Sequence, residues 1–256
     1  MSFEEKIKSL YKSGQDKYLE HISIDCVIFG FHENELKVLL LKPKYAGDWA
    51  LPGGFVAKQE DLDNAATRIL KERTGLNKIY LQQFHTFGSP HRSTKNINEH
   101  FLNTVGIKMT SSWMFDRFVT VGYYSLVDFT EVQPKTDIFS DSCEWFNIHH
   151  IPGLILDHGK ILQYALTHLQ LQLNYYPIGH NLLPVKFTMP ELQKLYETIL
   201  DRQLDRRNFQ RKMIASGILK RLDETKKGVA HKAPYYYNFD IRRYRKATLR
   251  GLGFEG

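Results

Sequence analysis

Residues 48–76, DWALPGGFVAKQEDLDNAATRILKERTGL, contain the pattern that decides the fold. Two glycines lead into a polar loop, and the residues that follow it in the sequence predict a helix over 60–74. Its apolar positions repeat at i, i+3, i+4, i+7 and i+8, which is the period of one buried helix face. The residues of this face are Leu62, Ala65, Ala66, Ile69 and Leu70. Gly75 predicts the C-terminal cap, so the stretch is expected to form a loop–helix–loop unit.

The same stretch has the spacing of a known motif. Gly54 is followed after five residues by Glu60 and after seven more by Arg68, and Gly75-Leu76 ends the pattern. This spacing resembles the Nudix box. The resemblance implies a mixed sheet between helices, a Nudix-like α/β/α sandwich, with the box as its loop–helix–loop. Arg68 and Glu60 are then expected to pair and to hold the loop against the helix.

Two carboxylates of that box are missing. The box expects glutamate at positions 69 and 73, where this chain has Ile69 and Arg73. Positions 69, 72 and 73 share one helix face, where three carboxylates would hold the Mg²⁺ that activates water. Glu72 alone cannot do so. The sequence therefore predicts a retained scaffold without hydrolysis, with no catalytic residues, no metal site and no cofactor.

The remaining part of this region predicts a sensing domain over residues 1–176. Strands are expected at 22–31, 36–41, 80–87, 117–126 and 143–147, and helices within 1–20 and over 157–173. The segment 93–116 is rich in Ser, Thr and Asn and is expected to be an inserted loop. Residues near the glycine loop and this insertion suit a polar, anionic or polyhydroxylated small molecule. These ligand-binding candidates are Lys42, Trp49, Gly54, Phe55, Arg92 and Asp116. Each is equally well explained as an ordinary surface charge or core aromatic residue.

The positive charge lies at one end of the chain. Residues 185–256 contain 17 lysines and arginines against 8 acidic residues, whereas residues 1–184 contain 18 basic and 20 acidic ones. A basic module beside a near-neutral one suggests a polyanion-binding appendage, although a merely soluble basic surface would have the same composition.

The order of elements in that basic part is typical of a winged helix-turn-helix over residues 177–256. Thr188-Met-Pro-Glu191 is a capping-box pattern with proline in the first turn. Asp205 predicts the cap of a second helix that ends near Ser216, and strands are expected at 218–222 and 235–239. Pro177 and Gly179 mark the expected domain boundary.

The second helix has the composition of a DNA-reading element. Phe209, Met213 and Ile214 are expected to face inward, which leaves its basic and amide side chains outside. Arginine can read guanine, and asparagine or glutamine can read adenine, while lysine holds phosphates. The DNA-binding candidates on this helix and on the wing are Arg206, Arg207, Asn208, Gln210, Arg211, Lys212, Lys226, Lys227 and Lys232. A solvated amphipathic helix is the alternative.

The chain from residue 22 onward resembles the Nudix-related transcriptional regulators. The stretches that carry the resemblance are FGFHENELKVLLLK (29–42), LPGGFV (51–56), PIGHNLLPVKFTMPELQKLYE (177–197) and DRRNFQRK (205–212). The resemblance implies a homodimer whose binding to operator DNA is changed by a small effector. ADP-ribose serves one branch, which controls NAD metabolism, and a pentose such as L-arabinose serves another.

The quoted stretches look more like the sugar-sensing branch, so an L-arabinose-responsive repressor is expected. The alternatives are an ADP-ribose-sensing regulator and a Nudix hydrolase of nucleotide sugars with a basic accessory tail. A pseudoenzyme that binds RNA or a protein partner is a third possibility. Two cysteines without a disulfide framework, the lack of a signal-peptide pattern and the lack of an apolar run of spanning length predict a cytoplasmic protein without membrane contact.

Overall fold

The computed structural model describes most of the chain, in two compact units. The described residues are 2–44, 47–76, 80–92, 102–104, 106–109, 111–137, 139–175, 180, 182–228 and 233–250. One unit comprises Met1–Phe29, Val38–Leu126 and Glu131–Ala165, and the other comprises Gly30–Lys37, Val127–Thr130 and Leu166–Gly256. We call them the sensor unit and the winged-helix unit.

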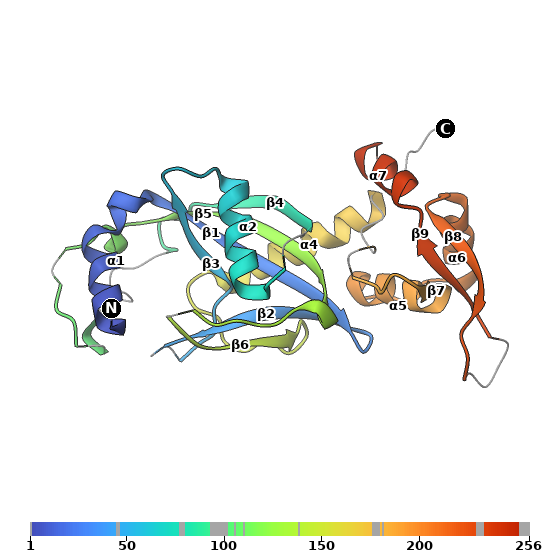
Figure 1. Cartoon of the computed structure of the whole chain (residues 1–256), viewed down its shortest axis with the longest axis horizontal. Helices are drawn as coiled ribbons and strands as arrows, with labels where there is room; N and C mark the ends of the chain where they lie inside the picture. Colours follow the sequence, from blue (N-terminus) through green and yellow to red (C-terminus); the bar gives the residue numbers. More distant parts are fainter. Residues whose placement is uncertain are drawn as a thin grey trace. The chain divides into compact units, whose positions relative to one another are not determined.

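A β-sheet forms the centre of the Nudix-like fold, and its strands lie in a different order from that along the chain (Figure 1). In the described residues its strand order is β4-β5-β1-β2-β6, and β3 pairs with β1. The strands are β1 (Tyr18–His32), β2 (Glu35–Pro43), β3 (Gly53–Ala57), β4 (Tyr80–Phe87), β5 (Val119–Asp128) and β6 (Ser140–Asn147). All five predicted strands are confirmed, and β1 and β2 are longer than expected.

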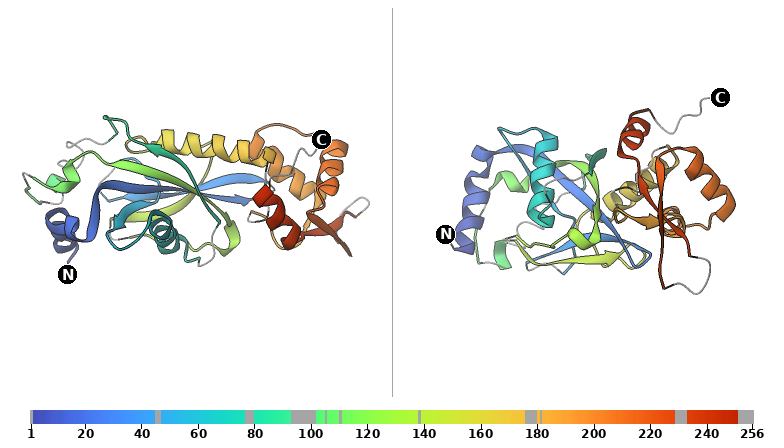
Figure 2. Two further views of the ribbon diagram at one scale, coloured as in Figure 1. Left: turned by 90° about the horizontal axis from the view of Figure 1, so that it is seen from above. Right: turned by 45° about the vertical axis from the view of Figure 1, so that its right-hand side comes forward.

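Helices cover both faces of this sheet. Helix α2 (Leu62–Thr74) and the first part of α4 (His158–Tyr175) lie on opposite faces, as Figure 2 shows, which confirms the expected sandwich. Asp61 caps the start of α2, and Gly75 ends it with a φ of 75°, in the left-handed region where glycine costs least. No helix in the described part of the chain is long and apolar enough to cross a membrane.

The segment expected to be a polar inserted loop contains apolar anchors. Leu102 and Ile107 are buried in a cluster with Ile7 and Tyr11 of helix α1 (Phe3–Lys17). The short 3-10 helix η1 (Trp113–Phe115) also packs on α1, because the Trp113 indole donates a hydrogen bond of 2.8 Å to the Leu10 carbonyl. The described part of this segment therefore holds α1 in place.

The C-terminal part forms the expected winged helix. Its helices are α5 (Met189–Leu200), α6 (Arg206–Ala215) and α7 (Ile241–Arg250), and its strands are β7 (Phe187–Thr188), β8 (Leu219–Thr225) and β9 (Tyr235–Phe239), in the order β7-β9-β8. Both predicted caps are confirmed: Thr188 and Glu191 form a capping box on α5, and Asp205 caps α6. Three further arginines, Arg242, Arg243 and Arg245, lie on α7.

Aromatic packing orients α6 on α5. The rings of Tyr196 and Phe209 lie 5.3 Å apart, and Met213, one turn after Phe209, is also buried. Ile214 was expected to face inward but is 53% exposed. Five residues advance a helix by about 140° beyond a full turn, so Ile214 cannot share a face with Phe209.

The winged-helix unit also includes the tip of the β1–β2 hairpin. The Thr198 hydroxyl of α5 donates a hydrogen bond of 3.1 Å to the carbonyl of Asn34 in that tip. The expected domain boundary at residues 176 and 177 stays a prediction, and Pro177 and Gly179 lie outside the described residues.

Candidate functional site

Arg68 clamps the glycine loop onto helix α2. Its guanidinium donates hydrogen bonds to both carboxylate oxygens of Glu60, at 2.5 and 3.1 Å, and to the Phe55 carbonyl at 2.9 Å. These bonds hold the pKa of Glu60 below its ordinary value. The predicted pairing of Arg68 and Glu60 is confirmed, and both residues serve the shape of the loop.

The helix face that would hold a metal ion in a Nudix hydrolase has a different chemistry. Ile69 is buried under the loop, so close that a Cβ on Gly54 would lie 3.1 Å from its Cδ1. Arg73 is 6% exposed, and its Nη2 lies 2.6 Å from Asp137 Oδ2. Glu72 Oε1 lies 3.6 Å from Arg68 Nη1. Because Glu72 and Asp137 each face a guanidinium and Ile69 carries no oxygen, these residues do not fit Mg²⁺.

A cavity of about 570 Å³ lies between α1 and this helix face. Its wall combines the glycine loop, Tyr18, and charged side chains of both signs. The basic residues are Lys6, Lys17, Arg68 and Arg73, and the acidic ones are Asp16, Glu72 and Asp137. We call it the α1–α2 cavity. Its size and mixed lining suit a polar ligand with an anionic part.

A second cavity, of about 590 Å³, lies on another face of α1. Lys12 and Glu20 line it together with Trp113 and Asp116 from the segment before β5. The two cavities are thus separated by a single helix.

The predicted ligand-binding residues fall into three groups. Gly54 and Phe55 line the α1–α2 cavity, and Asp116 lines the second cavity. Lys42 and Trp49 line neither of these two cavities. Lys42 donates to the Gly47 carbonyl, and its Nζ lies 5.4 Å from the Trp49 ring centre.

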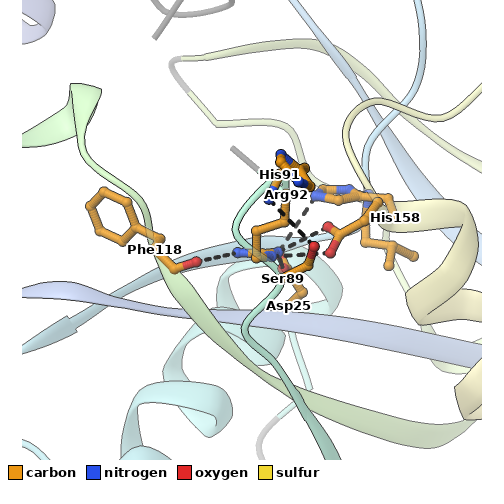
Figure 3. Close-up of polar contacts among 8 residues, drawn as sticks. Asp25, Ser89, His91, Arg92, Phe118 and His158 are labelled. Atoms are coloured by element: carbon orange, nitrogen blue, oxygen red, sulfur yellow. Dashed lines mark hydrogen bonds and ion pairs between the residues drawn. The ribbon is translucent and has the colours of Figure 1, made fainter. Parts of the chain in front are cut away.

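Arg92 lies in a buried ion cluster and lines neither of these two cavities, and its role in ligand binding stays a prediction (Figure 3). Its Nε and Nη2 each donate to Asp157 at 3.1 Å, Nη2 also donates to Asp25 at 3.2 Å, and Nη1 donates to the Phe118 carbonyl at 3.2 Å. With 3% of its side chain exposed, this guanidinium joins β1 to the start of α4.

His158 connects the same cluster to the glycine loop. Its Nδ1 accepts a hydrogen bond of 2.9 Å from the backbone of Leu51, and its Nε2 lies 3.8 Å from Asp25. Burial lowers the pKa of His158, which keeps the ring neutral near pH 7. Leu51 comes two residues before Gly53, which lines the α1–α2 cavity. The hydrogen bond between Leu51 and His158 therefore connects the buried cluster to the cavity wall.

Several cavity residues were absent from the sequence-based candidates. Arg73 was recognised only as a missing carboxylate, and its partner Asp137 is 64 residues away, a separation that leaves no signal in the sequence. Lys17 and Tyr18 come from α1 and the start of β1, whose position over α2 depends on contacts with residues 102–115.

Helix α6 presents unpaired basic side chains to solvent. Arg206, Arg207, Gln210 and Lys212 are exposed, and in the described residues they have no ion-pair or hydrogen-bond partner. Arg211 is also exposed, and its guanidinium donates a hydrogen bond of 2.8 Å to Asn208 Oδ1. This is the surface that sequence analysis expected to meet DNA.

The two wing lysines differ in their surroundings. Lys226 Nζ lies 2.7 Å from Glu191 Oε1, whose carboxylate also caps α5, whereas Lys227 is exposed and has no partner in the part of the chain that the structure describes. Lys232 lies outside the described residues. The charge of Lys226 is therefore partly compensated inside the protein.

Comparison with known proteins decides the family. Residues 19–165 match the NUDIX domain, and residues 179–239 match the NrtR DNA-binding winged helix domain. The ADPR responsive transcriptional repressor NtrR of Acinetobacter baylyi is 32% identical over 231 residues, which cover 87% of this chain and 83% of that protein. The chain belongs to the NrtR family.

Other relatives of this NrtR-family chain agree on the fold. Crystal structures of Shewanella oneidensis NrtR, one complexed with a 27mer DNA, have a TM-score of 0.68 at 23% identity and cover 88% of this chain and 96% of that one. A MutT/nudix family protein from Enterococcus faecalis has a TM-score of 0.62 at 20% identity, covering 94% and 100%. An ADP-ribose pyrophosphatase of Methanocaldococcus jannaschii is 27% identical over 159 residues, 61% of this chain and 81% of that enzyme.

These comparisons confirm a Nudix domain joined to a DNA-binding winged helix. They do not support the sugar-sensing branch, because the 32% identical relative, which covers 87% of this chain, is named for its response to ADPR.

Proposed function

We propose that this chain is an ADP-ribose-responsive transcriptional repressor. ADP-ribose binds in the α1–α2 cavity without being hydrolysed, and α6 and the wing bind operator DNA. The observation that carries the proposal is the cavity wall, where Ile69 and Arg73 stand in place of the carboxylates of a Nudix hydrolase. The 32% identical repressor supports the choice of effector and the sign of regulation.

The chemistry of the cavity favours ADP-ribose over a free pentose. Arg68, Arg73 and Lys17 provide positive charge for a diphosphate, and the rings of Tyr18 and Phe55, 5.6 Å apart, provide an aromatic surface for a base. L-arabinose is uncharged and has no phosphate oxygens for these cationic groups to bind.

Binding and turnover measurements on the full chain test the first half of the proposal. We expect ADP-ribose, but not L-arabinose, to give saturable heat in titration calorimetry. With Mg²⁺ or Mn²⁺ present, chromatography should show no release of AMP above background. A chain that binds only L-arabinose, or that releases AMP in a metal-dependent reaction, would overturn it.

A DNA experiment tests the second half. A duplex selected by the full chain from a random library should bind it better than bulk DNA, and ADP-ribose should change that affinity. Failure to enrich any sequence would contradict the operator-binding role.

The small footprint of one winged helix, about 600–1,000 Å² of buried surface, supports a homodimer that reads two half-sites. We also propose that the repressor acts in the cytoplasm. Light scattering that shows a monomer at micromolar concentration, with and without the selected duplex, would exclude the dimer.

A further inference from the structure

Within the proposed function, the binding of a diphosphate poses a question of charge. A Nudix hydrolase neutralises the diphosphate of its substrate with Mg²⁺ on the face formed by positions 69, 72 and 73. Here that face does not fit the ion, yet it still lines the α1–α2 cavity. We propose that the Arg73 guanidinium binds the effector's diphosphate in place of Mg²⁺, so that effector binding is independent of divalent metal ions.

The bonding of Arg73 supports this role. Its Nη2 is bound to Asp137, but its Nε is buried and has no hydrogen-bond partner in the described residues. A buried N–H without an acceptor is energetically costly, and most such groups in proteins are satisfied. An anionic oxygen entering the cavity would supply the missing acceptor after a small rotation of the side chain.

The neighbouring arginine is not equivalent. Arg68 already makes two hydrogen bonds to Glu60 and one to the Phe55 carbonyl, so it is committed to the loop. Arg73, by contrast, is buried in the cavity wall, and its Nε–H has no acceptor in the described residues. A planar guanidinium also matches a phosphate in geometry, and it remains charged at any physiological pH.

Asp137 limits the positive charge that a ligand meets. It accepts the hydrogen bond from Arg73, and 23% of its side chain is exposed. The carboxylate holds the guanidinium in place and also competes with the diphosphate for it. Removing this charge while keeping the shape should therefore strengthen diphosphate binding.

The first test is calorimetry of ADP-ribose on the full chain, in EDTA and in Mg²⁺. We expect dissociation constants within about twofold of each other. Binding that appears only with Mg²⁺ would overturn the inference about Arg73 and leave the proposed effector intact. Absence of ADP-ribose binding in both buffers would refute the proposed function itself.

The second test uses two substitutions that break the same ion pair. Arg73→Gln removes the cation and should weaken ADP-ribose binding at least tenfold, whereas Asp137→Asn frees the cation and should strengthen binding at least threefold. Lys71→Gln removes an exposed charge from the same helix, outside the cavity, and should change nothing.

A purely structural role for Arg73 predicts a different pattern. Both substitutions would then weaken binding, because both would break the same contact with the loop that precedes β6. If Arg73→Gln does not fold, Asp137→Asn still decides between the two explanations. Weaker or unchanged binding in Asp137→Asn would overturn the inference.

Discussion

The arginines of the sensor unit and those of helix α6 have opposite surroundings. In the sensor unit Arg68, Arg73 and Arg92 are each bonded to carboxylates of the same unit, and Arg92 is almost fully enclosed. On α6 the arginines at 206 and 207 face solvent without an acidic partner in the described residues. Paired charges build the shape of a pocket, whereas unpaired charges remain available for a polyanion. Arg73 belongs to the first group and keeps one donor unused.

The largest expected effect separates these two groups by stability. Arg92→Met should lower the free energy of unfolding by about 3–5 kcal/mol, because it leaves Asp25 and Asp157 buried without a counter-charge. Arg207→Met should change it by less than about 0.5 kcal/mol. Urea unfolding of the full chain measures both. Equal unfolding midpoints would show that the cluster is not structural, and a failure of the Arg92 variant alone to fold is the extreme form of the expected result.

The second prediction concerns base reading on α6. Asn208 orients Arg211 toward solvent, so Arg211→Ala should weaken binding to a selected duplex by about 1–3 kcal/mol and relax the preference at one base pair. Lys212→Ala should weaken selected and random duplexes alike, since a phosphate contact has no sequence preference. Gel-shift titrations measure both. A selected-to-random ratio unchanged by Arg211→Ala would remove that residue from the reading surface.

The third prediction is a pH dependence that originates in two histidines, His158 of the buried cluster and His168 of α4. Burial lowers the pKa of His158, and that of His168 also, so the unfolded chain takes up protons below pH about 6.5 that the folded chain does not. The free energy of unfolding should therefore be highest above that pH. It should decline as the pH falls toward the lowered pKa of the folded state, by at most about 1.4 kcal/mol per pH unit for each group. His158→Gln should reduce this slope in urea midpoints between pH 8 and 5. The exposed His21→Gln serves as control, and equal slopes in both variants would contradict the assignment.

The smallest expected effect compares the two wing lysines. If Lys227 contacts a phosphate, Lys227→Ala should reduce the slope of the logarithm of the DNA-binding constant against the logarithm of the salt concentration by about 0.9 in magnitude. Lys226→Ala should flatten it less, because Glu191 already compensates that charge. Glu191→Gln frees Lys226 and should steepen the dependence. Identical slopes for the two lysine variants would mean that the ion pair opens on DNA.

The sequence predicts the winged helix well because its signals are local. The Thr188 and Asp205 caps and the inward pair Phe209 and Met213 each depend on residues within one turn of one another. The same reasoning fails for Ile214, because its apolar side chain lies off the helix face that Phe209 and Met213 share.

Side-chain roles in the sensor unit could not be read in the same way. The spacing of the Nudix-like motif predicts the fold and the Arg68–Glu60 clamp, which span eight residues. Arg92, by contrast, meets Asp157 from 65 positions away, and no local pattern distinguishes a buried arginine with such a partner from one in a pocket wall. Residues that lie so far apart in the sequence become partners only through tertiary packing.

The interleaving of the two units has a consequence for dissecting the gene. Each unit is assembled from three separate stretches of chain, and the hairpin tip that accepts the hydrogen bond of Thr198 is encoded about 160 codons before it. A recombinant fragment of residues 177–256 would lack that tip and the turn at 127–130, where Phe129 stacks on His32 at 4.3 Å. Sensing and DNA binding can thus be separated by point substitutions, but no single cut in the coding sequence separates the two units from one another.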